Sequence, residues 1–222
     1  MVRCMQLIYL HGFASSPGSN KAQKFTRALA GRGVSATVPD LNQGDFAGMT
    51  LSRQLALLDQ LAAGSPPRSV VLIGSSMGAY VSALFAARDD RAAALVLMAP
   101  AFGFIERWTG RMSQEALSEW ERRGSMMVFH YATEQMTPIG WGLVEDARAH
   151  PAYPDIGTLP ALVFHGLHDE SVPADCSRRF ASDRPSVALR LLDDDHSLAA
   201  SADRIIAESF EFLAPWIPEL GR

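Results

Sequence analysis

The chain has 222 residues, 48% hydrophobic and 20% charged, and its 24 acidic and 20 basic side chains give a formal net charge of −4. This length and composition are typical of a soluble globular chain and exclude a mainly disordered one. Lys21 and Lys24 are the only lysines, and the sequence lacks the basic stripe that nucleic-acid binding requires. We therefore expect no nucleic-acid partner.

The sequence also argues against membranes and metals. No apolar run approaches the ~18 residues that span a bilayer, and residues 1–7 lack the separate apolar core and cleavage site of a secretion signal. We expect a cytoplasmic protein with no membrane partner. Cys4 and Cys176 are far apart, fit no metal or disulfide pattern, and are expected to be buried or inert thiols. No metal-ligand spacing is present, so we expect no metal.

Strand and helix patterns alternate along the chain. Buried apolar runs predict strands, and apolar residues at helical spacing behind a Ser or Thr cap predict helices. In chain order the predicted elements are strand 5–10, a helix from Ser19 to Gly31 or Gly33, strand 34–39, helix 51–62 after Thr50, strand 69–73, helix 77–88, strand 93–98, strand 160–165, helix 174–182, strand 187–192 and helix 199–216. This order predicts an α/β fold with a mostly parallel six-stranded sheet and helices on both faces.

The stretch between Pro100 and Leu159 interrupts this alternation. About sixty residues are far more than one crossover needs, and they contain Trp108, Trp120 and Trp141. We expect a cap insertion at about 101–158 made of two or three short helices, one of them 113–123. The prediction is a single domain, 1–222, that carries this insertion.

The strand at 69–73 runs directly into Gly-Ser-Ser-Met-Gly at 74–78, and a helix of small residues follows. This is the G-x-S-x-G pattern of a nucleophile elbow, whose glycines let a sharp strand-to-helix turn form without side-chain collisions. The spacing makes Ser76 the candidate nucleophile. It also places the backbone N–H of Met77 at a helix N-terminus, where it can stabilise an oxyanion.

A serine nucleophile needs a general base and an acid that orients it. Asp169 follows the predicted strand at 160–165, and His196 follows the strand at 187–192. Because parallel strands end at the same edge of a sheet, we expect Ser76, Asp169 and His196 to meet there.

With these motifs, and with His-Gly-Phe at 11–13 after the first strand, the chain resembles the α/β-hydrolase superfamily along nearly its whole length. Residues 9–17 look like small bacterial serine esterases, and residues 168–173 resemble the branch with acyl-protein thioesterases and acyl-glucuronide esterases. The chain departs from the larger pattern of the superfamily by lacking two N-terminal strands, and we therefore expect a minimal version of the fold. The resemblance implies a sheet in which the first strand lies between the second and third. It implies a Ser76–Asp169–His196 triad, an oxyanion hole from the Phe13 and Met77 N–H groups, and no cofactor.

Other residues have alternative interpretations. His11 could transfer protons, but a His-Gly pair here more often shapes the oxyanion loop. His168 could compete for the base role, although it precedes the last strand. We interpret the remaining candidates as structural or solvated features, and they are the carboxylates 193–195, the Gly-x-Gly-x-x-Ala match at 31–36, and Arg122 with Arg123.

The predicted function is hydrolysis of a carboxylic ester or thioester of a small acyl substrate through an acyl-enzyme. We expect one or two of four insertion aromatics to line the acyl pocket, and the candidates are Phe102, Phe104, Trp120 and Trp141. Alternatives are a ligand-binding module with little or no turnover, and a hydrolase of amide or C–C bonds. The pattern does not specify the acyl chain length, the leaving group or the oligomeric state.

Overall fold

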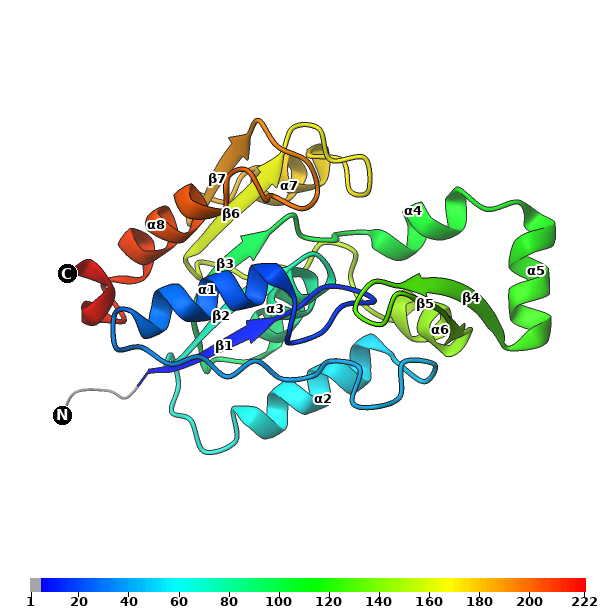
Figure 1. Ribbon diagram of the computed structural model, residues 1–222, viewed down its shortest axis with the longest axis horizontal. Coiled ribbons are helices and arrows are strands. Elements are labelled where there is room, and N and C mark those ends of the chain that lie inside the picture. The colour runs from blue at the N-terminus through cyan, green and yellow to red at the C-terminus, as the bar shows by residue number, and fades with distance from the viewer. Residues whose placement is uncertain (1–4) are drawn as a thin grey trace.

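The computed structural model describes residues 5–222, so Cys4 lies outside the described residues. Its centre is a five-stranded sheet in which every neighbouring pair is parallel, in the order β1-β2-β3-β6-β7. The strands are β1 (Gln6–Leu10), β2 (Val70–Ser75), β3 (Ala92–Met98), β6 (Ala161–Gly166) and β7 (Val187–Leu192). Parallel strands end at one edge, so the loops after β1, β2, β6 and β7 meet there (Figure 1).

The described part of the sheet has five strands rather than the six predicted, because the segment 34–39 forms a single bridge. Thr37 pairs with Ile8 of β1, through one hydrogen bond from its N–H to Leu7 O and one accepted from Tyr9 N–H. Pro39 has no N–H and cannot extend the ladder. The segment still lies beside β1 on the side away from β2, which is the position that the resemblance implies.

Helices cover both faces of the sheet (Figure 1). One face packs against α1 (Asn20–Ala30), α8 (Ala202–Leu213) and the short 3-10 helix η1 (Pro218–Gly221), and the other against α2 (Leu51–Leu61), α3 (Met77–Arg88) and α7 (Asp175–Ala181). The predicted caps form: Ser19 Oγ accepts from Ala22 N–H at the start of α1, and Thr50 Oγ1 from Arg53 N–H at the start of α2. No helix in the described part of the chain is long and apolar enough to cross a membrane.

The region from 101 to 158 contains three helices and a hairpin. They are α4 (Phe104–Gly110), α5 (Gln114–Arg123), the antiparallel pair β4 (Ser125–His130) and β5 (Gln135–Gly140), and α6 (Gly142–Arg148). These elements lie beyond the carboxyl ends of the strands, in green in Figure 1. The hairpin was not predicted because its outward residues Met127, Phe129 and Met136 are also apolar, which removes the polar–apolar alternation typical of a strand.

Candidate active site

The turn between β2 and α3 holds Ser76 in a strained conformation. Its φ is 54° and its ψ is −116°, outside the regions that ordinary residues adopt. The flanking glycines make this turn possible, because a Cβ on Gly74 would lie 2.5 Å from the Cα of Ala79, and one on Gly78 would lie 2.3 Å from the carbonyl oxygen of Leu10. The predicted elbow therefore forms, and its backbone packs directly against the end of β1.

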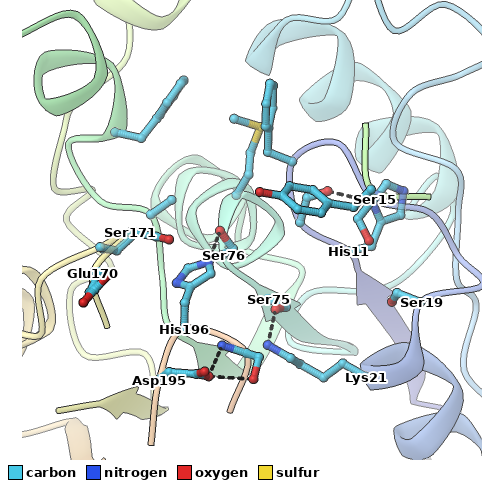
Figure 2. A pocket seen from close by; sticks show the side chains of 18 of the residues that line it. His11, Ser15, Ser19, Lys21, Ser75, Ser76, Glu170, Ser171, Asp195 and His196 are labelled. Carbon is cyan, nitrogen blue, oxygen red and sulfur yellow. Dashed lines mark hydrogen bonds between the residues drawn. The ribbon is translucent and has the colours of Figure 1, made fainter. Parts of the chain in front are cut away.

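The loops after β6 and β7 bring the other two predicted residues to Ser76. His196 Nε2 lies 3.1 Å from Ser76 Oγ, and His196 Nδ1 lies 2.6 Å from Asp169 Oδ2. Figure 2 shows the imidazole of His196 directed at Ser76. Gly166, at the end of β6, allows this approach, since a Cβ there would lie 2.4 Å from the carbonyl oxygen of Asp194.

Asp169 is buried and accepts hydrogen bonds on both oxygens. Oδ1 accepts from the N–H groups of Ser171 at 2.9 Å and Val172 at 2.7 Å, and Oδ2 faces His196 and the Nε2 of His165 at 3.2 Å. Burial alone would raise the pKa of the Asp169 carboxyl. The hydrogen bonds from His165, His196 and Val172 outweigh it and hold this pKa well below its usual range. Asp169 is thus an anion that can orient and stabilise an imidazolium.

His165 is a residue of this site that the sequence patterns did not identify. It is the fifth residue of β6 and fully buried, with Nδ1 2.6 Å from Ser177 Oγ and Nε2 2.8 Å from Val172 O. Because the carbonyl oxygen of Val172 can only accept, the imidazole of His165 carries its proton on Nε2. The same N–H also faces Asp169. The sequence feature that could have indicated His165 is a polar residue near the end of an otherwise apolar, buried strand.

The loop after β1 lies against the elbow, as the predicted oxyanion hole requires. A Cβ on Gly12 would lie 3.3 Å from the Cβ of Ser76, and both Phe13 and Met77 line the same cavity as Ser76. Within residues 5–222, neither the N–H of Phe13 nor that of Met77, the first residue of α3, donates to another protein group. Two free backbone donors therefore flank the serine, which is the arrangement that stabilises a developing oxyanion.

A cavity of about 990 Å³ opens above Ser76. Its walls differ in chemistry. The loop after β1, the start of α3 and the cap contribute apolar groups, which are Phe13, Met77, Ala101, Phe104, Trp108 and Tyr131. The cap also contributes two cations, Arg107 of α4 and Arg111 directly after it. The side toward α1 contributes polar groups, which are Tyr9, Ser15, Ser19, Lys21, Ser75 and Ser197.

One or two of four insertion aromatics were expected to line the pocket, and Phe104 is the one of the four that does. Phe102 is fully buried and stacks on Phe180 with ring centroids 4.2 Å apart. Trp120 is buried in the cap, where its Nε1–H donates to Ile139 O, and Trp141 packs edge-on against it. Phe102, Trp120 and Trp141 are therefore core residues, because an aromatic side chain in the sequence is expected to be buried whether it faces the core or the cavity. Trp108 of α4, which is not one of the four candidates, also lines the cavity.

His11 and His168, the two alternative candidates for proton transfer, contact groups other than Ser76. His11 is buried; its Nδ1–H donates to Gly12 O, its Nε2 accepts from Leu41 N–H, and burial lowers the pKa of its imidazole. These contacts tie the loop after β1 to the segment at Leu41. His168 lies at the cavity wall but pairs with Asp193 at 2.6 Å, and both side chains are exposed.

The remaining candidates have local roles. Asp194 is buried and accepts from the N–H groups of Asp195 and Ser201, and Asp195 accepts from Ser197, so these carboxylates support the turns after β7. Gly31 and Gly33 end α1, and Arg122 pairs with Glu119 on α5. Cys176 is buried beside Arg107. No cluster suited to a metal ion is found among residues 5–222.

A model of the uncharacterised protein family UPF0227 matches residues 6–207. Several solved structures are similar. A candidate hydrolase from Agrobacterium vitis S4 is 24% identical, with a TM-score of 0.81, over 96% of this chain and 89% of that chain. Alpha/beta hydrolase domain-containing protein 10 from mouse is 21% identical with a TM-score of 0.78, over 95% and 90%. Est1E from Butyrivibrio proteoclasticus is 20% identical with a TM-score of 0.77, over 98% and 90%. No curated protein matches in sequence. These likenesses show the α/β-hydrolase fold.

Proposed function

The chain belongs to the uncharacterised protein family UPF0227, and from the site that its fold builds we propose that it is a serine hydrolase. The proposed reaction is cleavage of a carboxylic ester or thioester bond of a small acyl substrate through an acyl-enzyme. The observation that carries the proposal is the continuous relay from Ser76 Oγ to His196 to Asp169, at 3.1 Å and 2.6 Å, at the floor of the cavity.

In the acylation step, the proton of the Ser76 hydroxyl moves to His196. The Ser76 hydroxyl donates to His196 Nε2, so the imidazole takes this proton as Ser76 Oγ attacks the carbonyl carbon. Asp169, already ionised, holds the Nδ1–H of His196 and stabilises the imidazolium that forms. The N–H groups of Phe13 and Met77 receive the charge on the carbonyl oxygen. His196 then protonates the leaving alcohol or thiol, and the acyl group stays on Ser76.

Deacylation repeats these steps with water. His196 removes a proton from a water molecule, the hydroxide attacks the acyl carbonyl, and His196 returns the proton to Ser76 Oγ as the carboxylic acid leaves. The aromatic side chains of the cap, Phe104 and Trp108, give an acyl chain a surface on which to pack.

The test is the variant Ser76→Ala, assayed on 4-nitrophenyl esters of graded acyl length and on a panel of acyl thioesters. We expect kcat to fall by about 10⁴ to 10⁶, as loss of a triad nucleophile does. A fluorophosphonate probe should label the wild-type chain at Ser76 Oγ with loss of fluoride, and should not label the variant. Ser118→Ala, at an exposed serine of α5, is the matched control and should keep full activity.

Near-normal turnover by Ser76→Ala, or labelling at another residue, would refute the assignment. Tight ligand binding by the wild-type chain with no turnover would favour the ligand-binding alternative instead.

A further inference from the structure

The side of the cavity toward α1 contains polar side chains that the proposed mechanism does not use. Lys21, in the first turn of α1, extends to the end of β2 and donates from Nζ to Ser75 Oγ at 3.0 Å (Figure 2). Tyr9 of β1 lines the same cavity. This region is therefore adjacent to Ser76 and separate from the cap wall, which combines Phe104 and Trp108 with the cations Arg107 and Arg111.

The sheet register explains why these side chains gather. Tyr9 of β1 is paired with Ile73 of β2, and Ser75, two residues farther along β2, points to the same face of the sheet. That face is covered by α1, on which Lys21 and Phe25 are one turn apart. The Phe25 ring packs on the Tyr9 ring at 5.8 Å, and this contact places Lys21 over Ser75.

Lys21 Nζ and the Tyr9 hydroxyl both have donor capacity that no protein acceptor in the described part of the chain uses. Within residues 5–222, Ser75 Oγ is the one hydrogen-bond partner of Lys21 Nζ, and no carboxylate lies within 4.0 Å of it. The hydroxyl of Tyr9 is buried and has no hydrogen-bond partner in the described part of the chain. Buried donors of this kind are normally paired, since burying an unpaired polar or charged group costs free energy. The site thus offers several unused donors.

The charges facing Lys21 are Asp169, Asp194 and Asp195, each of which raises the pKa of its ammonium group. Burial outweighs them and lowers this pKa to about 8. The ammonium is therefore poorly solvated where it stands, and a ligand that brings an acceptor into contact would relieve this cost.

We propose that Lys21 and Tyr9 form a subsite for a carboxylate group of the substrate, so that the hydrolase prefers esters or thioesters that carry a second, negatively charged carboxylate. A carboxylate accepts hydrogen bonds on both oxygens and donates none. This matches an ammonium that uses one of its three donors on Ser75 and a phenol that has no partner. This inference rests on the proposed function, because it assigns a substrate class to the same cavity.

The experiment compares kcat/KM for charged and neutral substrates in two pairs. 4-Nitrophenyl hydrogen adipate against 4-nitrophenyl hexanoate places the carboxylate on the acyl side, and 3-carboxyphenyl butyrate against phenyl butyrate places it on the leaving group. We expect the wild-type chain to favour the acidic member of one pair by about tenfold or more, the value of one charge-assisted hydrogen bond.

Lys21→Met should lower kcat/KM for the acidic ester of that pair by about 10- to 100-fold and for the neutral ester by less than about threefold. Tyr9→Phe keeps the ring packing and should cost about three- to tenfold, again only on the acidic ester. Lys24→Met removes the same charge from the same helix outside this cavity and should leave both rates unchanged. In the wild-type chain the preference should decline as pH rises past about 8, since Lys21 then loses its proton.

Equal rates for both members of each pair in the wild-type chain would overturn the proposal. An equal loss of kcat/KM on acidic and neutral esters in Lys21→Met would also overturn it, because Lys21 would then act only by stabilising the structure of the elbow. If the wild-type chain cleaves no ester and takes no fluorophosphonate label, the proposed function fails, and binding of monobutyl adipate to Ser76→Ala by calorimetry tests the subsite alone. Binding weakened by Lys21→Met then supports the subsite, and unchanged binding refutes it.

Discussion

At the scale of single residues, the surroundings of Asp169 explain how one carboxylate can stabilise the fold and, in the proposed mechanism, also orient His196. Two backbone N–H groups, from Ser171 and Val172, hold one oxygen, while His165 and His196 face the other. All four contacts favour the ionised form, and together they outweigh the burial of the group. Ionisation of Asp169 is therefore linked to the stability of the fold as well as to the orientation of His196.

The first prediction concerns Asp169→Asn. The amide cannot hold His196 in the same tautomer, and we expect kcat to fall by about 10⁴, as such a change does in other triads. The folded-state pKa of Asp169 lies below the unfolded value of ~3.9, so its ionisation stabilises the fold above about pH 4 and this contribution is lost as pH falls.

Urea unfolding at a series of pH values measures that linkage. Between about pH 5 and about pH 3 the wild-type chain should lose more unfolding free energy than Asp169→Asn. Asp90→Asn, at an exposed carboxylate, is the control and should follow the wild-type slope. Parallel curves for the wild-type chain and Asp169→Asn would contradict the prediction.

At the scale of elements, the cap insertion contributes side chains both to the hydrophobic core and to the wall of the cavity. Trp108 of α4 and Trp120 of α5 are in contact, with ring centroids 5.1 Å apart, yet Trp108 lines the cavity and Trp120 is buried. The hairpin also contacts the oxyanion loop, since Tyr131 N–H donates to Ala14 O at 2.9 Å. The cap therefore shapes one wall of the site and stabilises the loop that carries Phe13.

The two tryptophans should respond differently to substitution. Trp120→Ala removes a buried ring and a hydrogen bond to Ile139 O, and we expect a loss of about 3–5 kcal/mol in unfolding free energy. Trp108→Ala should cost less stability and should raise KM for long-chain esters, because its ring faces the cavity. Urea denaturation and steady-state kinetics on both variants check this. Similar stability losses with unchanged KM in Trp108→Ala would argue against an acyl-binding wall.

At the scale of the whole molecule, the cap and the sheet share one apolar core. The cluster that packs Ile8, Leu72 and Phe85 between the sheet and its helices continues without interruption to Trp120 and Ile139 in the insertion. Elements that bury the same surface lose it together when either opens. The structure thus gives no basis for separate unfolding of the cap.

This continuity predicts a single unfolding transition. Three of the four tryptophans, Trp108, Trp120 and Trp141, lie in the insertion, so tryptophan fluorescence reports mainly on the cap, whereas far-UV circular dichroism reports on all helices and strands. The two signals should give the same midpoint in urea. A fluorescence transition at lower urea than the dichroism transition would mean that the cap unfolds independently.

Much of the site follows from local patterns. A strand, a Gly-x-Ser-x-Gly turn and a small-residue helix are continuous in the chain, so the elbow at Ser76 could be predicted from steric limits at Gly74 and Gly78. The positions of Asp169 and His196 followed because parallel strands deliver their ends to one edge. The general α/β architecture followed from the alternation of elements in the same way.

Tertiary contacts decided the rest, because they depend on residues distant in sequence. Thr37 forms one bridge instead of a sixth strand because Pro39 lacks a donor. The burial of Phe102, Trp120 and Trp141 depends on the neighbours that pack on each side chain. The packing of His165 behind Asp169, and of Lys21 over Ser75, depends on the register and spacing of the layers. Side-chain periodicity predicts that a residue is buried, and only the folded chain decides whether it faces a core or a cavity.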